Sequence, residues 1–172
     1  GLGFGQVWSR WGTRQAGKLL LGCFLAIQAG GVVMLHPFGL SYYNLRVGGL
    51  PGAERRGLEL TYWSDAIDGV LLDRLAEESE PRAKAAVVPT LYPGQGVLTT
   101  TARLLKKEII LDDEAAATTA EWLLVSRRTA YWKPEVIQRL REGGGRQVAT
   151  RTRQGVWLSA LWSFPRGSPK PR

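Results

Sequence analysis

The feature that most constrains this chain is the uncharged apolar run LLLGCFLAIQAGGVVML at residues 19–35, in which Gln28 is the single polar side chain. A helix rises about 1.5 Å per residue, so this run covers roughly 25 Å of a bilayer hydrocarbon core about 30 Å thick. Tryptophans precede the run and tyrosines follow it, where they suit the two membrane interfaces. The run therefore predicts one transmembrane helix.

Two other interpretations of the run compete with a membrane helix. A core helix of a soluble domain would be weakened by Gly17, Gly22, Gly30 and Gly31, at up to about 1 kcal/mol each relative to alanine. Membrane helices tolerate glycine. A secretory signal peptide needs a small-residue cleavage site, and no convincing one follows residue 35. We expect the membrane helix.

The formal charge of +8 is distributed unevenly along the 172 residues. Residues 1–35 carry three basic groups and no acid, residues 36–126 carry 9 basic and 13 acidic groups, and residues 127–172 carry 11 basic and 2 acidic groups. The acidic middle and the apolar run argue against a soluble nucleic-acid binder. Basic residues just before the run favour a cytoplasmic N-terminus, with the following domain outside the inner (plasma) membrane.

The composition limits the chemistry of the chain. Cys23 is the single cysteine and His36 the single histidine, so an intrachain disulfide and a multi-histidine metal site are both excluded. We expect no metal and no cofactor. The acidic run at residues 112–114 suits a solvated loop or helix cap better than a cation site. Asp65 and Asp68 suit the first turn of a helix better than an acid–base pair.

Beyond residue 58, strands alternate with helices, which predicts a small α/β domain that ends in an antiparallel hairpin. We expect a short strand or an extended segment at 58–63, strands at 85–91, 109–111, 122–125, 146–152 and 156–164, and helices at 64–78, 99–107 and 134–141. Ser64 is the expected N-cap of the first helix. Leu98, Ala102 and Leu105 are expected to share the buried face of the second.

Val156, Leu158, Ala160, Trp162 and Phe164 are expected to share one face of the last strand. The resulting division of the chain is a membrane-surface loop (1–18), a transmembrane helix (19–35), a juxtamembrane motif and turn (36–57), an extracytoplasmic α/β domain (58–164) and a disordered tail (165–172). Pro37 should end the membrane helix within a residue or two of His36. Asn44 should hold the turn that follows through hydrogen bonds to nearby backbone.

Two consecutive motifs carry a resemblance to a known family. HPFGLSYYNLRVGG (36–49), followed by GLELTYWSDAID (57–68), resembles the region after the last membrane helix of bacterial family 39 glycosyltransferases. These enzymes are similar to dolichyl-phosphate-mannose protein mannosyltransferases. AEWLLVSR (120–127) and QGVWLSALW (154–162) look like the closing strands of the family's extracytoplasmic domain. The chain departs from the pattern at Ser64, where glycine is usual.

The resemblance implies transfer of a sugar from a polyprenyl-phosphate donor to a lipid or protein acceptor, on the outer side of the membrane. The family's catalytic acid lies in an early extracytoplasmic loop, and no residue here matches it. The chain therefore looks like a C-terminal module that is inactive alone. His36, Tyr42, Tyr43 and Asn44 are candidate substrate-binding residues at the membrane surface; an interfacial anchor with a capped turn is the alternative role.

A second hypothesis does not depend on the resemblance. The chain would then be a complete single-pass membrane protein whose outer domain binds a glycan or a protein partner. The two hypotheses differ in what precedes residue 1: further hydrophobic spans support the transferase, and their absence supports the binding protein.

Overall fold

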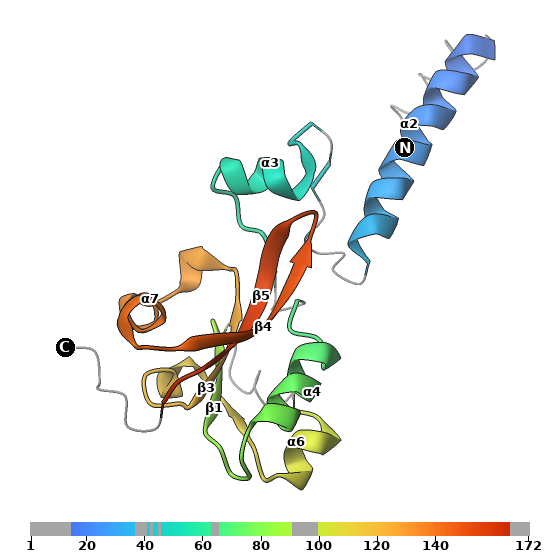
Figure 1. The fold of residues 1–172 in the computed structure, drawn as a ribbon. Helices are drawn as coiled ribbons and strands as arrows, with labels where there is room; N and C mark the ends of the chain where they lie inside the picture. Colours follow the sequence, from blue (N-terminus) through green and yellow to red (C-terminus); the bar gives the residue numbers. More distant parts are fainter. Residues whose placement is uncertain are drawn as a thin grey trace.

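The structure is a computed structural model that describes residues 15–36, 41, 43–44, 46–62, 66–90 and 100–165. A mixed five-stranded sheet forms its frame, and an apolar helix near the N-terminus extends away from it (Figure 1). The strands are β1 (Ala85–Val88), β2 (Leu111–Asp112), β3 (Trp122–Ser126), β4 (Arg146–Arg153) and β5 (Val156–Ser163). The helices are α2 (Gln15–Leu35), α3 (Gly49–Arg55), α4 (Gly69–Glu78), α6 (Ala102–Lys106) and α7 (Pro134–Glu142), with 3₁₀ turns η2 (Glu114–Ala116) and η3 (Thr129–Tyr131).

Helix α2 has the properties of a membrane span. Its apolar window Gly17–Met34 is entirely unburied, and it is the one helix in the described residues that is long and apolar enough to cross a bilayer. A signal sequence meets the same two criteria of length and composition. The helix ends at Leu35, beside Pro37, as predicted. It begins at Gln15, so residues 15–18 belong to the helix and not to a surface loop.

The sheet has the strand order β2-β1-β3-β5-β4. Strands β2, β1 and β3 run parallel, while β5 is antiparallel to both β3 and β4. Every residue of β1 and of β3 is buried, because helices cover both faces of the parallel strands. The expected α/β class with a closing hairpin is confirmed.

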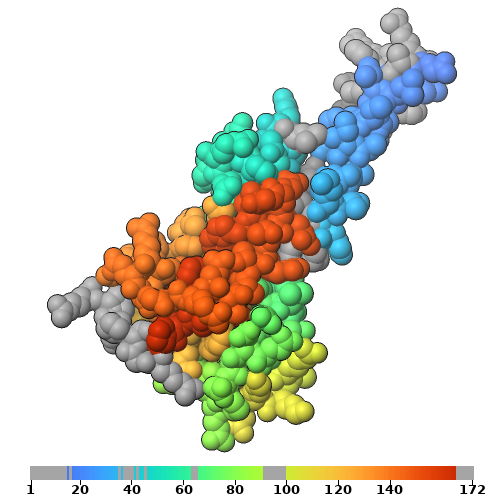
Figure 2. Space-filling model, in the orientation of Figure 1, coloured from blue at the N-terminus to red at the C-terminus, as the bar shows by residue number. Residues whose placement is uncertain are grey.

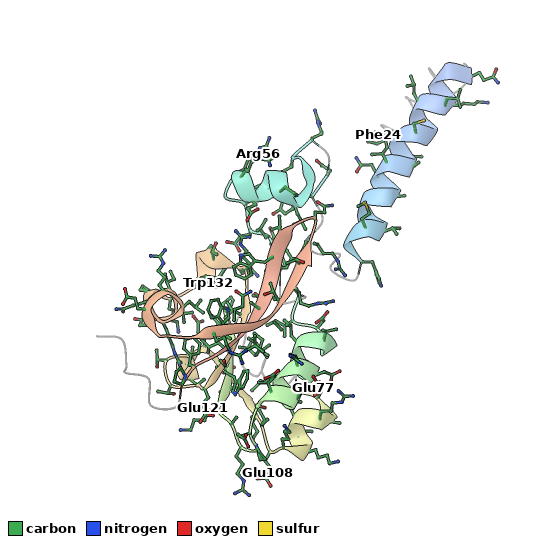
Figure 3. All side chains as sticks on the ribbon, in the orientation of Figure 1. Phe24, Arg56, Glu77, Glu108, Glu121 and Trp132 are labelled. Carbon is green, nitrogen blue, oxygen red and sulfur yellow. The ribbon has the colours of Figure 1, made fainter. Side chains whose placement is uncertain are left out.

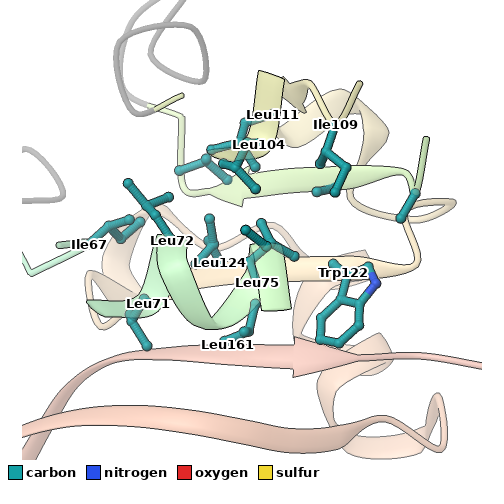
Figure 4. Close-up of a cluster of buried hydrophobic side chains, with 14 residues drawn as sticks. Ile67, Leu71, Leu72, Leu75, Leu104, Ile109, Leu111, Trp122, Leu124 and Leu161 are labelled. Carbon is teal, nitrogen blue, oxygen red and sulfur yellow. The ribbon is translucent and has the colours of Figure 1, made fainter. Parts of the chain in front are cut away.

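Two apolar clusters cover the two faces of the sheet. On one face, α4 and α6 pack against the sheet through a cluster that includes Leu71, Leu75, Leu104, Leu124 and Leu161 (Figure 4). On the other face, α7 and the residues after η2 pack on alternate strand positions. This cluster consists of Ala86, Val88, Ala117, Ala120, Leu123, Val125, Val136 and Phe164.

Of the two structures expected for 58–63, the strand does not form in the described part of that segment, residues 58–62. Strand β5 is already paired on both sides, by β3 and β4, so it offers no free edge at this point. Leu60 instead packs with Leu50 of α3 and Val156 of β5 in a third cluster. Apolar contact therefore holds this segment where a ladder of hydrogen bonds was expected.

The N-cap of helix α4 lies four residues later than predicted. Its N-cap is Asp68, whose Oδ1 accepts from the Leu71 amide at 3.3 Å, and its last residue is Glu78 as expected. The second oxygen of Asp68 lies 2.8 Å from Arg151 Nη2. Asp68 is thus a cap and an ion-pair partner. Ser64 and Asp65 lie outside the described residues.

Several strand boundaries also differ from the prediction. β1 ends at Val88, because Pro89 has no N–H to give to a ladder. β2 begins at Leu111, because the Ile109 amide donates to the carbonyl of Leu104 in α6 at 2.9 Å. β3 extends one residue further, to Ser126. The tail 166–172 is outside the described residues.

The closing hairpin forms as predicted, with β4 and β5 joined over Gln154 and Gly155. Both turn residues have positive φ, 51° and 77°, as in the turns that match the twist of paired strands. The predicted buried face of β5 is confirmed for Val156, Leu158, Ala160 and Phe164, while Trp162 is half-buried. Ser159 and Leu161 on the opposite face are buried as well, so the prediction of a single buried face was incomplete.

One buried charge was not expected from the sequence. Arg139 of α7 is 6% exposed and donates to the carbonyls of Ala117 and Ala120, with its guanidinium 4.2 Å from the centre of the Phe164 ring. Burial lowers the pKa of this guanidinium. The contact ties α7 to the loop that leads into β3.

Helix α6 presents a different face to the core than the sequence predicts. Leu104 is 0% exposed and Leu105 is 61% exposed. We expect Leu104→Ala to lower the free energy of unfolding by about 2–5 kcal/mol, because it leaves a cavity. Leu105→Ala should change it by less than about 0.5 kcal/mol. Denaturant titration of both variants in detergent micelles measures this, and equal losses or the reverse order would contradict the assigned face.

Candidate membrane-proximal site

The predicted site residues lie where α2 meets the sheet domain. His36 is exposed directly after α2, and its carbonyl oxygen accepts from Arg153 Nη2 at 3.4 Å. Tyr43 and Asn44 are half-buried. Tyr42 lies outside the described residues. The structure thus brings Tyr43 and Asn44 into the domain and leaves His36 on its surface.

Asn44 holds a tight turn, as predicted. Its side-chain oxygen accepts from the amides of Arg46 at 3.1 Å and Val47 at 3.3 Å. Its backbone carbonyl accepts from the amides of Val47 and Gly49, at 3.1 and 3.2 Å. Because these backbone groups occupy the amide oxygen, Asn44 has a structural role.

The glycines after this turn allow a short helix to pack closely on the hairpin. Gly48 and Gly49 have φ values of 87° and 63°. A Cβ on Gly52 would lie 1.8 Å from the carbonyl oxygen of Val47, so α3 closes onto the turn only with glycine there. Helix α3 was missed, because VGGLPG is typical of a turn; Pro51 near the start of the helix was the available signal.

Tyr43 connects the juxtamembrane segment to the rest of the domain through Glu59. The Tyr43 hydroxyl donates to the backbone carbonyl of Glu59. Burial raises the pKa of this phenol, and the neighbouring Tyr62 raises it further by charge repulsion and a hydrogen bond. Oε1 of Glu59 accepts from the Ala130 amide at 2.9 Å, and Oε2 lies 4.0 Å from Arg128 Nε. Glu59 thereby joins residue 43 to the loop that follows β3.

Two arginines follow β3 at its carboxyl end. The guanidinium of Arg127 lies 2.6 Å from Glu54 Oε1 and 4.9 Å from the centre of the Trp157 ring. The side chain of Arg128 is 12% exposed, and its guanidinium is 4.2 Å from the Tyr131 ring centre and 5.2 Å from that of Tyr62. Such cation–π contacts fix the orientation of both groups.

These arginines and Glu59 were not among the predicted site residues. The available signal was the position of Arg127-Arg128 directly after the buried run at 122–125, because ligands of open α/β sheets bind at the carboxyl ends of parallel strands. The partner of Arg128, Glu59, lies in a segment without regular structure. Its role could not be inferred from periodicity.

A small cavity of about 80 Å³ lies between α3 and the loop after β3. Glu54, Gly57, Leu58, Leu60, Arg127 and Thr129 line it. Small-molecule sites usually measure about 300–1,000 Å³, so this cavity admits a water-sized group and not a sugar ring. Ligand binding here would use the surface around Arg128.

The chemistry available to this site is binding and positioning. Within the described ranges, no group of three or more His, Cys, Asp and Glu side chains is arranged to hold a metal ion. Tyr43 is a hydrogen-bond donor, and its raised pKa extends the pH range in which the phenol keeps its proton. Arg127 and Arg128 supply fixed positive charge beside aromatic rings.

The raised pKa of Tyr43 predicts a pH-dependent contribution to stability. We expect Tyr43→Phe to lower the free energy of unfolding by about 1 kcal/mol at neutral pH, because the Glu59 carbonyl loses its donor. The folded pKa lies above the unfolded value of about 10, so the stabilisation is present below pH 10 and is lost as pH rises through the folded pKa.

Denaturant titration in detergent micelles, at neutral pH and above pH 10, tests this prediction. The difference between the wild-type protein and Tyr43→Phe isolates Tyr43 from the other tyrosines, which titrate in both proteins. The difference should shrink at high pH. A difference that is constant across pH would contradict the assigned proton linkage, and no difference at neutral pH would contradict the hydrogen bond.

Comparisons with known proteins do not identify the chain. No protein-family model matches its sequence, and no match is found among curated proteins or solved structures. Its function is therefore inferred from its residues and their geometry.

Proposed function

We propose that the chain is the membrane-anchored C-terminal module of a glycosyltransferase that moves a sugar from a polyprenyl-phosphate donor to a lipid or protein acceptor. The bond-making residues would lie in a transmembrane part outside residues 1–172. In this proposal α2 spans the inner membrane, and the sheet domain is extracytoplasmic. The motif resemblance at 36–49 and 57–68 suggests the chemistry.

One observation carries the proposal. The juxtamembrane motif follows directly after an unburied apolar helix and is packed into the domain. The Tyr43 hydroxyl donates to the Glu59 carbonyl, Asn44 holds a turn, and Gly52 packs closely against the Val47 carbonyl. Such a motif holds a folded domain close to the point where its anchor leaves the bilayer. A polyprenyl-phosphate donor presents its phosphate and sugar at that depth, with the polyprenyl chain in the hydrocarbon core.

The arginines after β3 suit such a donor. Guanidinium groups bind phosphate through paired hydrogen bonds, and tyrosine rings offer apolar faces and hydroxyl groups to a sugar. Arg128 lies between Tyr62 and Tyr131, on a loop that Glu59 connects to Tyr43. The module would bind and position, while the transmembrane part breaks and forms the glycosidic bond.

A second candidate function is a single-pass anchored domain that binds a glycan or a protein partner. The exposure of Tyr62 (38%) and Tyr131 (52%) beside Arg128 favours it, because exposed aromatic side chains are typical of recognition surfaces. This function requires no further transmembrane part.

An activity measurement separates the two functions. The coding sequence upstream of Gly1 should encode eight or more further hydrophobic spans with an early Asp-Glu loop. Membranes that contain this longer protein should transfer sugar from a radiolabelled polyprenyl-phosphate donor. Tyr43→Ala and Asn44→Ala should lower the rate but leave some turnover. A stop codon just before Gly1 would exclude the transferase, and complete loss of turnover in well-folded variants would place the motif in the catalytic centre.

Cysteine labelling tests the extracytoplasmic placement. In a Cys23→Ser background, Glu108→Cys lies on the exposed surface of the domain and Gln15→Cys at the far end of α2. A membrane-impermeant maleimide should label Glu108→Cys in intact cells and Gln15→Cys only after permeabilisation, because α2 separates the two sites. The opposite pattern would place the domain in the cytoplasm.

A further inference from the structure

Exposed arginines lie at the end of the sheet domain nearest α2. Arg56 lies beside α3, at the end of the domain nearest α2, whereas Glu77, Glu108 and Glu121 lie at the opposite end (Figure 3). Arg46 and Arg55 are exposed on the same turn and helix as Arg56. We call these three arginines the basic collar.

The basic collar surrounds the turn that Asn44 holds. Arg46 is part of the turn. The Nη1 of Arg56 donates to the carbonyls of Val47 and Gly52, which fixes its guanidinium against the start of α3. The Nη2 of Arg55 lies 3.8 Å from the Cβ position of Gly48. Three positive charges thus lie on the Asn44 turn and the C-terminal end of α3.

Among the described residues, no carboxylate pairs with the collar arginines. The acidic residue of α3, Glu54, instead pairs with Arg127 at 2.6 Å. Arginines at the other end of the domain are compensated: Arg74, Arg82 and Arg103 all pair with Asp or Glu. The three collar arginines therefore carry positive charge that no carboxylate of the described residues compensates.

The collar lies at the level where α2 leaves the bilayer. The turn of the β4–β5 hairpin contacts both neighbours: Arg153 Nη2 donates to the carbonyl of His36, and Gln154 Oε1 accepts from the Leu50 amide at 3.0 Å. The end of α2 and the start of α3 therefore meet the same hairpin turn. Figures 1 and 2 show α3 at the α2 end of the domain, above the hairpin.

We propose that the basic collar binds the headgroup phosphates of anionic lipids, in the leaflet at the C-terminal end of α2, and so docks the domain on the membrane surface. Guanidinium groups pair with phosphate oxygens in a bidentate geometry. The proposal rests on α2 crossing a bilayer and does not depend on sugar transfer.

Amide hydrogen exchange of the full chain in lipid nanodiscs tests the docking. Discs of phosphatidylcholine alone are compared with discs that also contain phosphatidylglycerol. Each basic residue near an anionic surface favours binding about fivefold, so three give roughly a hundredfold when their effects add. Headgroups bind the folded α3 and not its opened form, so amide protection over residues 46–56 should rise by up to this factor in anionic discs.

A charge-matched pair of variants makes the test specific. Replacing Arg46, Arg55 and Arg56 with glutamine should abolish the rise, whereas replacing Arg74, Arg82 and Arg103 should leave it intact. Unchanged exchange in β3 shows that each variant is folded. High salt should reduce the rise in the wild-type protein, because it screens exposed charges.

Three outcomes would overturn the docking. Protection that is equal in the two disc types excludes headgroup binding. An equal loss in both triple variants shows that net charge, and not the collar, is responsible. A rise that inorganic phosphate reproduces in phosphatidylcholine discs identifies a general anion site. A lack of transferase activity in the longer protein would leave the lipid docking unaffected.

Discussion

Burial of β5 on both faces is the constraint on which the rest of the domain depends. Leu161 packs under α4, Val156 and Leu158 pack under α3, and Phe164, directly after the strand, packs under α7. The strand also pairs with β3 and with β4. The three apolar clusters are therefore joined through β5. Helix α3 packs on the same strand that holds the sheet together.

Much of the fold could be predicted from local sequence, because several segments have a single physical solution. The apolar run that ends before Pro37 predicted the end of α2 correctly. The buried run at 122–125 predicted β3, and Gln154-Gly155 predicted the hairpin turn. In each case the side chains and the backbone favour the same structure. Such agreement is what makes a local prediction dependable.

The errors arose where tertiary contacts decide the structure. The face of α6 depends on Leu104 reaching the cluster under α4, and five residues are too few for periodicity to reveal it. The segment around Leu60 alternates like a strand, but it packs against β5, which is already paired on both sides. At the site, the turn role of Asn44 was predictable from its own chemistry, whereas the role of Glu59 depends on residues 43, 128 and 130.

The edges of the sheet have a consequence for self-association. Of the described strands, β2 at one edge has two residues, and β4 at the other carries Arg146, Arg151 and Arg153 and is irregular at two points in its pairing with β5. Short strands, positive charges and bulges all oppose the addition of a further strand. Crowded copies in one membrane would therefore resist edge-to-edge aggregation, and lateral assembly would have to use helices or loops.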